Sequence, residues 1–124
     1  VAAEDCNIMF LNGKKLLNTC DNGCEFHHTL IRNLLGIVAQ NNMYLNQKIK
    51  YISRKTTREK LIAYLTDQAK MKGSNDFTIP FNRQELADYL GVERSAMSAE
   101  LGKLTKLGIL QTQRSHFTLL KPLD

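Results

Sequence analysis

Residues 82–101 carry the pattern of two short amphipathic helices joined by a tight turn, and no other feature restricts the possible folds of the chain as strongly. Asn82 can cap a helix, and the Glu85 side chain, three residues later, can bond back to the cap residue. Two leucines four residues apart then share one helix face, and Gly91 can end the helix in the left-handed conformation. The pattern predicts a helical hairpin that turns at Gly91.

The second helix of this hairpin is expected to begin near Arg94 and to point polar or small side chains outward. Apolar residues recur there at helical spacing, which assigns the remaining positions to the outer faces. Those outward positions are Arg94, Ser95, Ser98, Ala99 and Lys103. A helix-turn-helix that reads DNA has this layout, but many helical hairpins have no connection with DNA. The spacing alone leaves both interpretations open.

The sequence after the hairpin favours the DNA-reading interpretation. Gly108 is expected to end the second helix, and residues 109–113 and 117–120 have the composition of two short strands around a polar turn at 114–116. A wing of this kind follows the phosphate backbone, where Arg114 would attract DNA of any sequence, with His116 and Lys121 as further candidates. The sequence therefore predicts a winged helix-turn-helix.

The charge of the chain supports the same conclusion, although weakly. Residues 1–47 carry three basic and four acidic side chains, residues 48–124 carry fourteen and eight, and the whole chain has a net charge of +5. The basic excess therefore lies with the expected DNA reader. A solvated basic surface without a nucleic-acid partner would have a similar composition.

A second strong pattern is a heptad repeat within residues 26–54, which contain no proline. The repeat predicts one long helix with an apolar seam along which two copies of the chain could pair. Its seam positions are Ile31, Leu35, Val38, Asn42, Leu45, Ile49 and Ile52. Asn42 is the polar residue of the seam and would fix a two-stranded register. The alternative is a helix that lies on its own domain, and a second stripe (Leu30, Leu34, Ile37 and Tyr44) predicts packing on a flank.

Local signals predict the remaining elements. Thr56 and Glu59 form a second capping-box pattern, which predicts a helix from about Thr57. Residues 77–81 alternate as a short strand, which Pro80 confines to a sheet edge or a strand end. Near the N-terminus, residues 8–11 are expected to form a strand, and the Asn12-Gly13 turn with Leu16 and Leu17 is expected to follow as a turn or short helix.

Composition excludes several classes of protein. With 124 residues, 43% hydrophobic and 23% charged, the chain is expected to be one globular, cytoplasmic protein without a leader sequence. No apolar run approaches the roughly 18 residues of a membrane span. An odd number of cysteines, three, fits a reducing compartment. No phosphate loop, HExxH or GxSxG motif is present, so we do not expect an enzyme.

The segment around residues 20–28 offers four potential metal ligands, Cys20, Cys24, His27 and His28. Their spacing matches none of the usual zinc motifs, and adjacent histidines on a helix point apart. We therefore predict no metal site. A redox or metal sensor that uses Cys20, Cys24 and His27 is the alternative, whereas the simplest interpretation is a polar loop with Cys6 and Cys20 as small core residues.

Taken together, residues 26–120 resemble the C-terminal half of a Crp/Fnr-family transcription regulator. The resemblance is carried by residues 48–61, 81–92 and 94–98, which read KIKYISRKTTREKL, FNRQELADYLGV and RSAMS. It implies a mainly α fold with a small β part. Its three parts would be a remnant of an effector-binding β-barrel (1–24), a dimerisation helix (25–54) and a winged helix-turn-helix DNA-binding domain (55–124).

The resemblance also implies a function and partners. The chain would be a fragment of a homodimeric regulator that binds double-stranded DNA at a palindromic operator, with RNA polymerase as a further candidate partner. No cofactor is expected within the fragment, and the effector of the whole protein is not identified. The competing interpretation is a helical dimerisation or protein-interaction module.

The family's DNA contacts transfer to this chain only at matching positions. Asn82 and Arg83 would lie at a phosphate-binding helix end, and Arg94 would match a base-reading arginine that pairs with guanine O6 and N7. The remaining candidate contacts are Ser95, Ser98, Lys103 and Arg114. The chain departs from the family at Ala99, where many relatives have a second arginine, and at Ser95, where the best-known member has glutamate. The family's operator sequence therefore does not carry over.

Overall fold

The computed structural model describes residues 5–17 and 24–121, which divide into two compact units, Val1–Met43 and Tyr44–Asp124. The first unit contains helix α1 (Gly13–Leu17) and the N-terminal part of helix α2 (Glu25–Ile52). The C-terminal turns of α2 belong to the second unit. The unit that contains the helix-turn-helix therefore begins within the long helix rather than after it.

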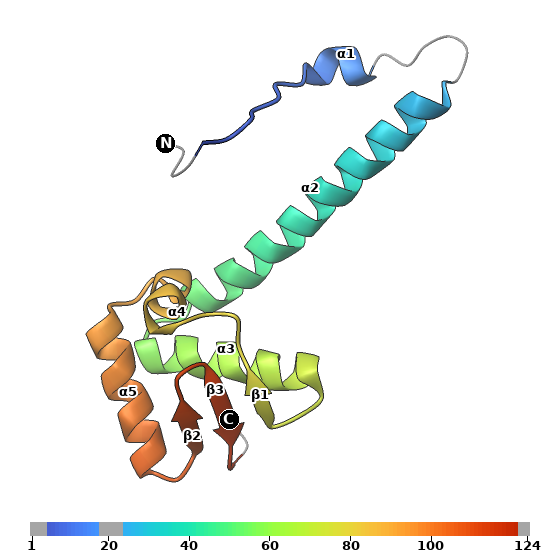
Figure 1. Cartoon of the computed structure of the whole chain (residues 1–124). Helices are drawn as coiled ribbons and strands as arrows, with labels where there is room; N and C mark the ends of the chain where they lie inside the picture. The colour runs from blue at the N-terminus through green and yellow to red at the C-terminus, as the bar shows by residue number, and fades with distance from the viewer. Residues whose placement is uncertain (1–4, 18–23, 122–124) are drawn as a thin grey trace. The chain divides into compact units, whose positions relative to one another are not determined.

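The second unit is a small, mainly helical domain with one three-stranded sheet. Its further elements are α3 (Thr57–Lys72), β1 (Asp76–Thr78), α4 (Arg83–Leu90), α5 (Arg94–Lys106), β2 (Leu110–Gln113) and β3 (His116–Leu119). Helix α5 contacts α3, α4 and β2, and α3 contacts β1 (Figure 1). The predicted helical hairpin and the two-stranded wing are both confirmed.

The strands of the described residues form one antiparallel sheet in the order β1-β3-β2. Strand β1 lies at an edge, as Pro80 predicted, and pairs with β3 so that Phe77 stands opposite Phe117. The two rings stack with their centroids 6.2 Å apart. The sequence predicted a short strand over residues 77–81, whereas β1 already ends at Thr78, and it gave no sign of the pairing with β3.

A single hydrophobic core fills the second unit. It is formed by side chains from α2, α3, α4, α5, all three strands and Ile79, and its buried members among the described residues all belong to this unit. Those members are Tyr51, Leu61, Tyr64, Leu65, Ala69, Phe77, Ile79, Leu86, Ala87, Tyr89, Leu90, Met97, Leu101, Leu104, Leu110, Phe117 and Leu119. The apolar positions that the sequence assigned to the two reader helices are therefore the ones that pack.

The helix boundaries follow their caps. Asn82 and Glu85 form the predicted capping box, and Gly91 ends α4 with a positive φ of 60°. At α3, Thr56 accepts a hydrogen bond from the Glu59 N–H, but the Glu59 carboxylate accepts from the N–H of Lys55 instead of Thr56. That second cap is therefore not the reciprocal box that the sequence predicted.

Helix α2 confirms the predicted long helix and ends two residues earlier than expected. Its last turn tightens, because the Arg54 N–H donates to the Tyr51 carbonyl three residues back, at 3.2 Å. The Tyr51 side chain is buried in the core, and the Tyr44 ring centroid lies 5.8 Å from that of Tyr89 on α4. The predicted flank contact is thus present at Tyr44.

Other local predictions were wrong. Residues 8–11 form no strand, because a strand needs a partner to pair its backbone groups, and the Phe10 side chain is 91% exposed. The short helix predicted as one alternative after residues 8–11 is present as α1, and Asn12 caps it by accepting from the Lys15 N–H. Cys6 is exposed and not a core residue. His116 belongs to β3 rather than to the turn, because it pairs with Gln113 across a two-residue turn.

Substitution of Gly91 tests the turn of the hairpin. A Cβ added there meets only Ile52 Cγ2 at 3.9 Å, so the cost of Gly91→Ala comes from the positive φ and should be about 1 kcal/mol of unfolding free energy. Gly102 within α5 is the matched control, since an added Cβ meets nothing within 4 Å and its φ is not in the left-handed region. Gly102→Ala should stabilise by about 0.5–1 kcal/mol. Urea denaturation would measure both, and equal signs would contradict the assignment.

Candidate nucleic-acid interface

Helix α5, the predicted recognition helix, begins directly after a capping glutamate. The Glu93 carboxylate accepts a hydrogen bond from the Ala96 N–H at 2.9 Å and another from the Ser95 hydroxyl. The Ser95 hydrogen bond, followed by the backbone N–H groups, lowers the pKa of Glu93 below its ordinary value. The sequence interpretation missed this cap, because the usual cap residues are serine, threonine, aspartate and asparagine rather than glutamate.

The exposed side of α5 carries the residues predicted to read bases. Met97 and Leu101 are buried against the core, whereas Arg94, Ser95 and Ser98 are exposed. Of these three, Ser95 already donates its hydroxyl hydrogen to Glu93. Arg94 is the cationic side chain among these three.

The N-terminus of α4 presents Asn82 and Arg83, and both side chains already have partners within the protein. The Asn82 side-chain oxygen accepts from the N–H groups of Gln84 and Glu85, each at 2.9 Å. The Arg83 guanidinium donates to the Thr112 hydroxyl at 2.6 Å, and burial lowers its pKa from the ordinary value. Both side chains therefore have a structural role within the protein.

The wing tip is a two-residue turn, Arg114–Ser115. Arg114 has a φ of 53°, the left-handed conformation that L-residues other than glycine seldom adopt. The Ser115 hydroxyl donates to the Phe81 carbonyl at 2.9 Å, and the Ile79 N–H donates to the Ser115 carbonyl at 3.0 Å. The turn is thus tied to the segment before α4 while the Arg114 side chain stays exposed.

These elements meet around a hollow of about 390 Å³. It lies among the N-terminus of α4, the start of α5 and the wing tip, and its lining holds three arginines and no acidic side chain. Its lining residues are Asn82, Arg83, Gln84, Arg94, Arg114 and Ser115. Four of the seven predicted DNA-contacting residues therefore gather at one place, and Gln84 is a member that the sequence interpretation did not include.

Lys103 lies apart from this group. It is nine residues after Arg94, and at about 100° per residue that spacing puts the two side chains on opposite flanks of α5. Lys103 pairs with Glu100 at 2.5 Å and lines a different hollow with residues 56–58 at the start of α3. Ser95 and Ser98 line neither of these two hollows.

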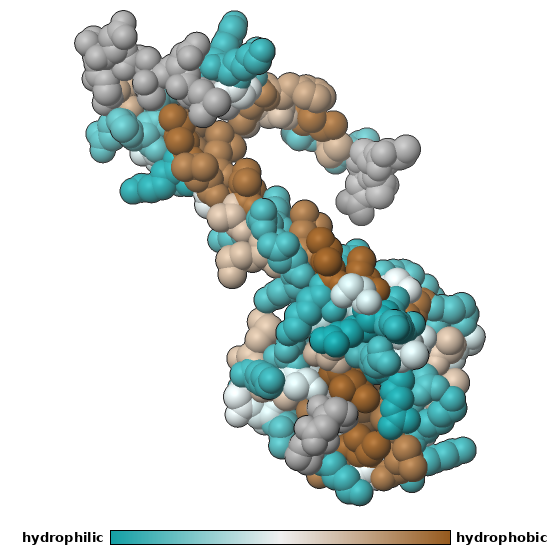
Figure 2. Space-filling view, turned by 180° about the vertical axis from the view of Figure 1, so that it is seen from behind, coloured by the Kyte–Doolittle hydropathy of each residue, from teal (hydrophilic) through white to brown (hydrophobic). Residues whose placement is uncertain are grey.

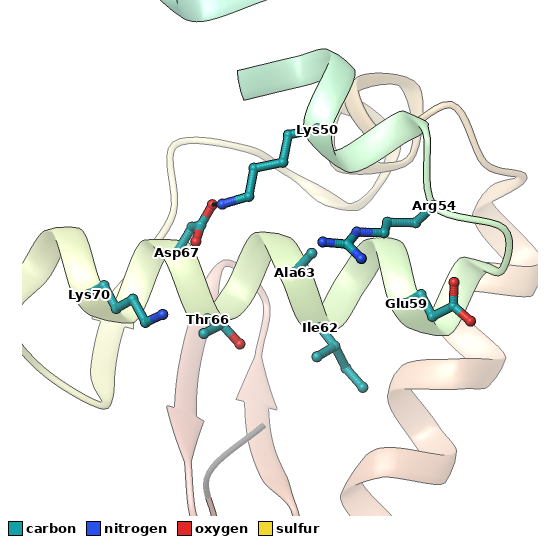
Figure 3. A pocket seen from close by; sticks show the side chains of 8 residues that line it. All are labelled: Lys50, Arg54, Glu59, Ile62, Ala63, Thr66, Asp67 and Lys70. Carbon is teal, nitrogen blue, oxygen red and sulfur yellow. Dashed lines mark hydrogen bonds and ion pairs between the residues drawn. The ribbon is translucent and has the colours of Figure 1, made fainter. Parts of the chain in front are cut away.

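A third hollow, of about 370 Å³, separates the end of α2 from α3 and contains none of the predicted DNA-contacting residues (Figure 3). Across it the Asp67 carboxylate accepts from the Lys50 ammonium at 2.6 Å and from the Tyr51 hydroxyl at 3.1 Å. Burial and the Asp67 carboxylate raise the pKa of the Tyr51 hydroxyl, so the proton stays on this donor. This network fastens the last turn of α2 to α3.

The predicted dimerisation seam on α2 is largely open to solvent in the single chain. Leu35 and Val38 are 64% and 62% exposed, and Leu45 and Ile49 are similarly exposed in the second unit. Hydrophobic side chains lie along α2 in Figure 2. Such a row of exposed apolar side chains is unusual on a helix without a partner.

The metal-sensor alternative receives no support from the part of the chain that the structure describes. There, no three His, Cys, Asp or Glu side chains come together in a way that could hold a metal ion. Cys24 is exposed, and Cys20 lies outside the described residues.

Comparison with known proteins identifies the domain. The family profile described as the Crp-like helix-turn-helix domain matches residues 59–123, more than half of the chain. The chain belongs to the Crp-like helix-turn-helix family. Membership in this family supports a DNA-binding transcription regulator, a class that is normally not enzymatic. The family match covers α4, α5 and the wing, which are the elements that line the three-arginine hollow.

Two further comparisons accompany this match. Among solved structures, the Crp-like chain is similar to the reduced, Fe(II) CO-sensing protein from R. rubrum, with 17% identity and a TM-score of 0.39. The similarity covers 79% of this chain and 47% of that one, so the chain spans less than half of its length. A search of curated protein sequences gave no significant match. None of the helices formed by the described residues has the length and apolar character needed to cross a membrane.

Arg114 offers a test in which stability and DNA binding should change in opposite directions. Arg114→Gly relieves the left-handed backbone, so the free energy of unfolding should stay level or rise by up to about 1 kcal/mol. The same change should weaken binding to every duplex and reduce the slope of log affinity against log salt by about 0.9, the share of one phosphate. Arg114→Lys is the control that keeps the charge and the slope. A lower stability in Arg114→Gly, or an unchanged slope, would contradict this assignment.

Proposed function

We propose that the chain binds a palindromic DNA operator as a homodimer, with one helix-turn-helix for each half-site. The observation that carries the proposal is the three-arginine hollow between α4, α5 and the wing tip. Two of its arginines, Arg94 and Arg114, come from segments twenty residues apart, and both side chains are exposed. A surface of this kind can contact base edges and the phosphate backbone together.

Within this proposal the predicted contacts have different tasks. Arg94 and Ser98 would face base edges from the exposed side of α5, and Ser95 would orient Glu93 as well as approach the DNA. The N-terminus of α4, which Asn82 caps, would contact a phosphate, and Arg114 would contact the neighbouring part of the DNA backbone. Lys103, on the other flank of α5, would reach a separate phosphate.

The dimeric part of the proposal rests on α2. The exposed apolar seam would be covered by the same seam of a second copy, and a two-fold pair of readers would require an inverted repeat in the DNA. The dimerisation residues would be Ile31, Leu35, Val38, Asn42, Leu45, Ile49 and Ile52. In this assignment residues 25–54 serve dimerisation and residues 55–124 read DNA.

Two further elements belong to the proposal. Residues 1–24 would be part of an effector-binding domain, whose strands would cover the exposed side chains of Ile8, Met9 and Phe10. RNA polymerase would be a partner of the DNA-bound regulator.

The experiment that tests the proposal is selection of bound duplexes from a random pool at physiological salt. We expect enrichment of an inverted repeat whose half-site centres are about one helical turn apart, with an affinity that falls steeply with salt. Enrichment of a single, non-repeated site would contradict the dimer. Absence of any enriched duplex, together with tight and salt-insensitive binding to a protein, would favour a protein-interaction module instead.

A further inference from the structure

Arg83 contacts one cross-strand residue pair of the wing hairpin. Its guanidinium donates to the Thr112 hydroxyl at 2.6 Å, and its Cζ lies 5.0 Å from the centroid of the Phe117 ring. Thr112 and Phe117 are directly opposite each other in the β2–β3 ladder. Side chains of directly opposite residues lie on the same face of a sheet, so one planar cation engages both strands of the hairpin at a single level.

The Thr112–Phe117 pair that Arg83 contacts lies close to the wing tip. The next pair along the ladder is Gln113 with His116, and the turn that carries Arg114 follows immediately. Arg83 is also the first residue of α4, directly after the cap. The contact therefore ties the helix-turn-helix to the wing at the end of the hairpin where Arg114 stands beside the three-arginine hollow.

We infer that Arg83 is a positioning residue that fixes the wing against α4 and so keeps Arg114 beside Arg94, rather than a phosphate contact. Its consequence for DNA rests on the proposed function, whereas the Arg83 contact itself is a property of the free protein. Arg83 is partly buried, which lowers its pKa, and this burial agrees with a guanidinium that packs against the wing. The hydrogen bonds of Ser115 hold the other side of the turn.

A double-mutant cycle of Arg83→Ala and Arg114→Ala separates this role from a direct phosphate contact. We expect each single change to weaken DNA binding roughly three- to tenfold and to lower the salt slope by up to about 0.9. If Arg83 acts through the wing, the double variant should be hardly weaker than Arg114→Ala alone, with the same salt slope. Additive losses of affinity, with a slope reduced by about 1.8, would overturn the inference.

Two conservative variants sharpen the test. Thr112→Val removes the hydrogen-bond acceptor without changing any charge, and it should reproduce part of the Arg83→Ala loss. Thr118→Val is the matched control, because it removes a hydroxyl of the same sheet that donates to Asp76 instead, and it should leave DNA affinity unchanged. Arg83→Lys should fail to restore binding, because lysine lacks the planar guanidinium. Full binding in both Thr112→Val and Arg83→Lys would favour a phosphate contact and overturn the inference.

Amide hydrogen exchange on the full chain without DNA supplies an independent readout. Arg83→Ala should speed exchange in β2 and β3 while α3 keeps its protection, whereas Thr118→Val should not change exchange around Thr112. Unchanged protection of the hairpin in Arg83→Ala would overturn the inference. If the native chain enriched no duplex, the proposed function would fail, and the exchange result would still decide whether Arg83 holds the wing.

Discussion

Replacing Leu35 and Val38 on α2 with glutamate is expected to yield a monomer that binds a palindromic duplex about a hundred- to ten-thousandfold more weakly. Both side chains are more than half exposed in the single chain and would be buried by a second copy. Glutamate at these seam positions would bury unpaired carboxylates between the helices, which strongly disfavours pairing. In a dimer bound to one half-site, the second reader is present at the other half-site at an effective concentration in the millimolar range, and a monomer loses this advantage. Sedimentation velocity and duplex titration would measure the two effects.

Gln40→Glu provides the matched control for this change. Gln40 is exposed on the same helix, but it lies outside the heptad seam. An added carboxylate there should leave the dimer mass in solution and the affinity for the palindromic duplex unchanged. The doubly substituted chain should still bind an isolated half-site like the native chain, because its reader lies in the second unit. A dimer that persists after Leu35 and Val38 are replaced would move the interface away from the seam.

Signals between close neighbours in the sequence made most of the second unit predictable. The cap at Asn82, the left-handed Gly91 and the apolar spacing of α4 and α5 each depend on residues within one or two helical turns. Interactions at this range are set by the geometry of the helix itself, so the pattern fixes the outcome. The face of α5 on which Lys103 lies could have been found in the same way, from its nine-residue distance to Arg94.

Contacts between distant residues were not predictable from these patterns. An alternating strand pattern shows which side chains face the core but not which strand is the neighbour, so the pairing of Phe77 with Phe117 was missed. The bond from Arg83 to Thr112 spans 29 residues and leaves no periodic trace in the sequence. The apolar run at residues 8–11 has the composition of a strand, yet no described strand pairs with it.

Replacing Arg94 with alanine is expected to weaken binding to the best half-site by about 1–3 kcal/mol and to relax the preference for one base pair. Arg94 is the first residue of α5, the end of a recognition helix that approaches base edges, and its side chain is exposed beside the three-arginine hollow. A guanidinium there can donate two hydrogen bonds to guanine O6 and N7. A duplex with another base at that position lacks this acceptor pair, so Arg94→Ala should affect it much less. Titration of a series of half-site variants would measure the difference.

Arg94→Lys separates base reading from simple charge attraction. Lysine keeps the positive charge and so should keep the salt slope. It cannot form the planar, bidentate guanidinium contact with guanine, so Arg94→Lys should lose much of the base preference. Lys106→Ala is a second control, since it removes a cation from the opposite end of α5 and should not change the base preference. An equal loss of affinity for every half-site in Arg94→Ala would make Arg94 a backbone contact, and base reading would then have to come from Ser98 and its neighbours on the exposed side of α5.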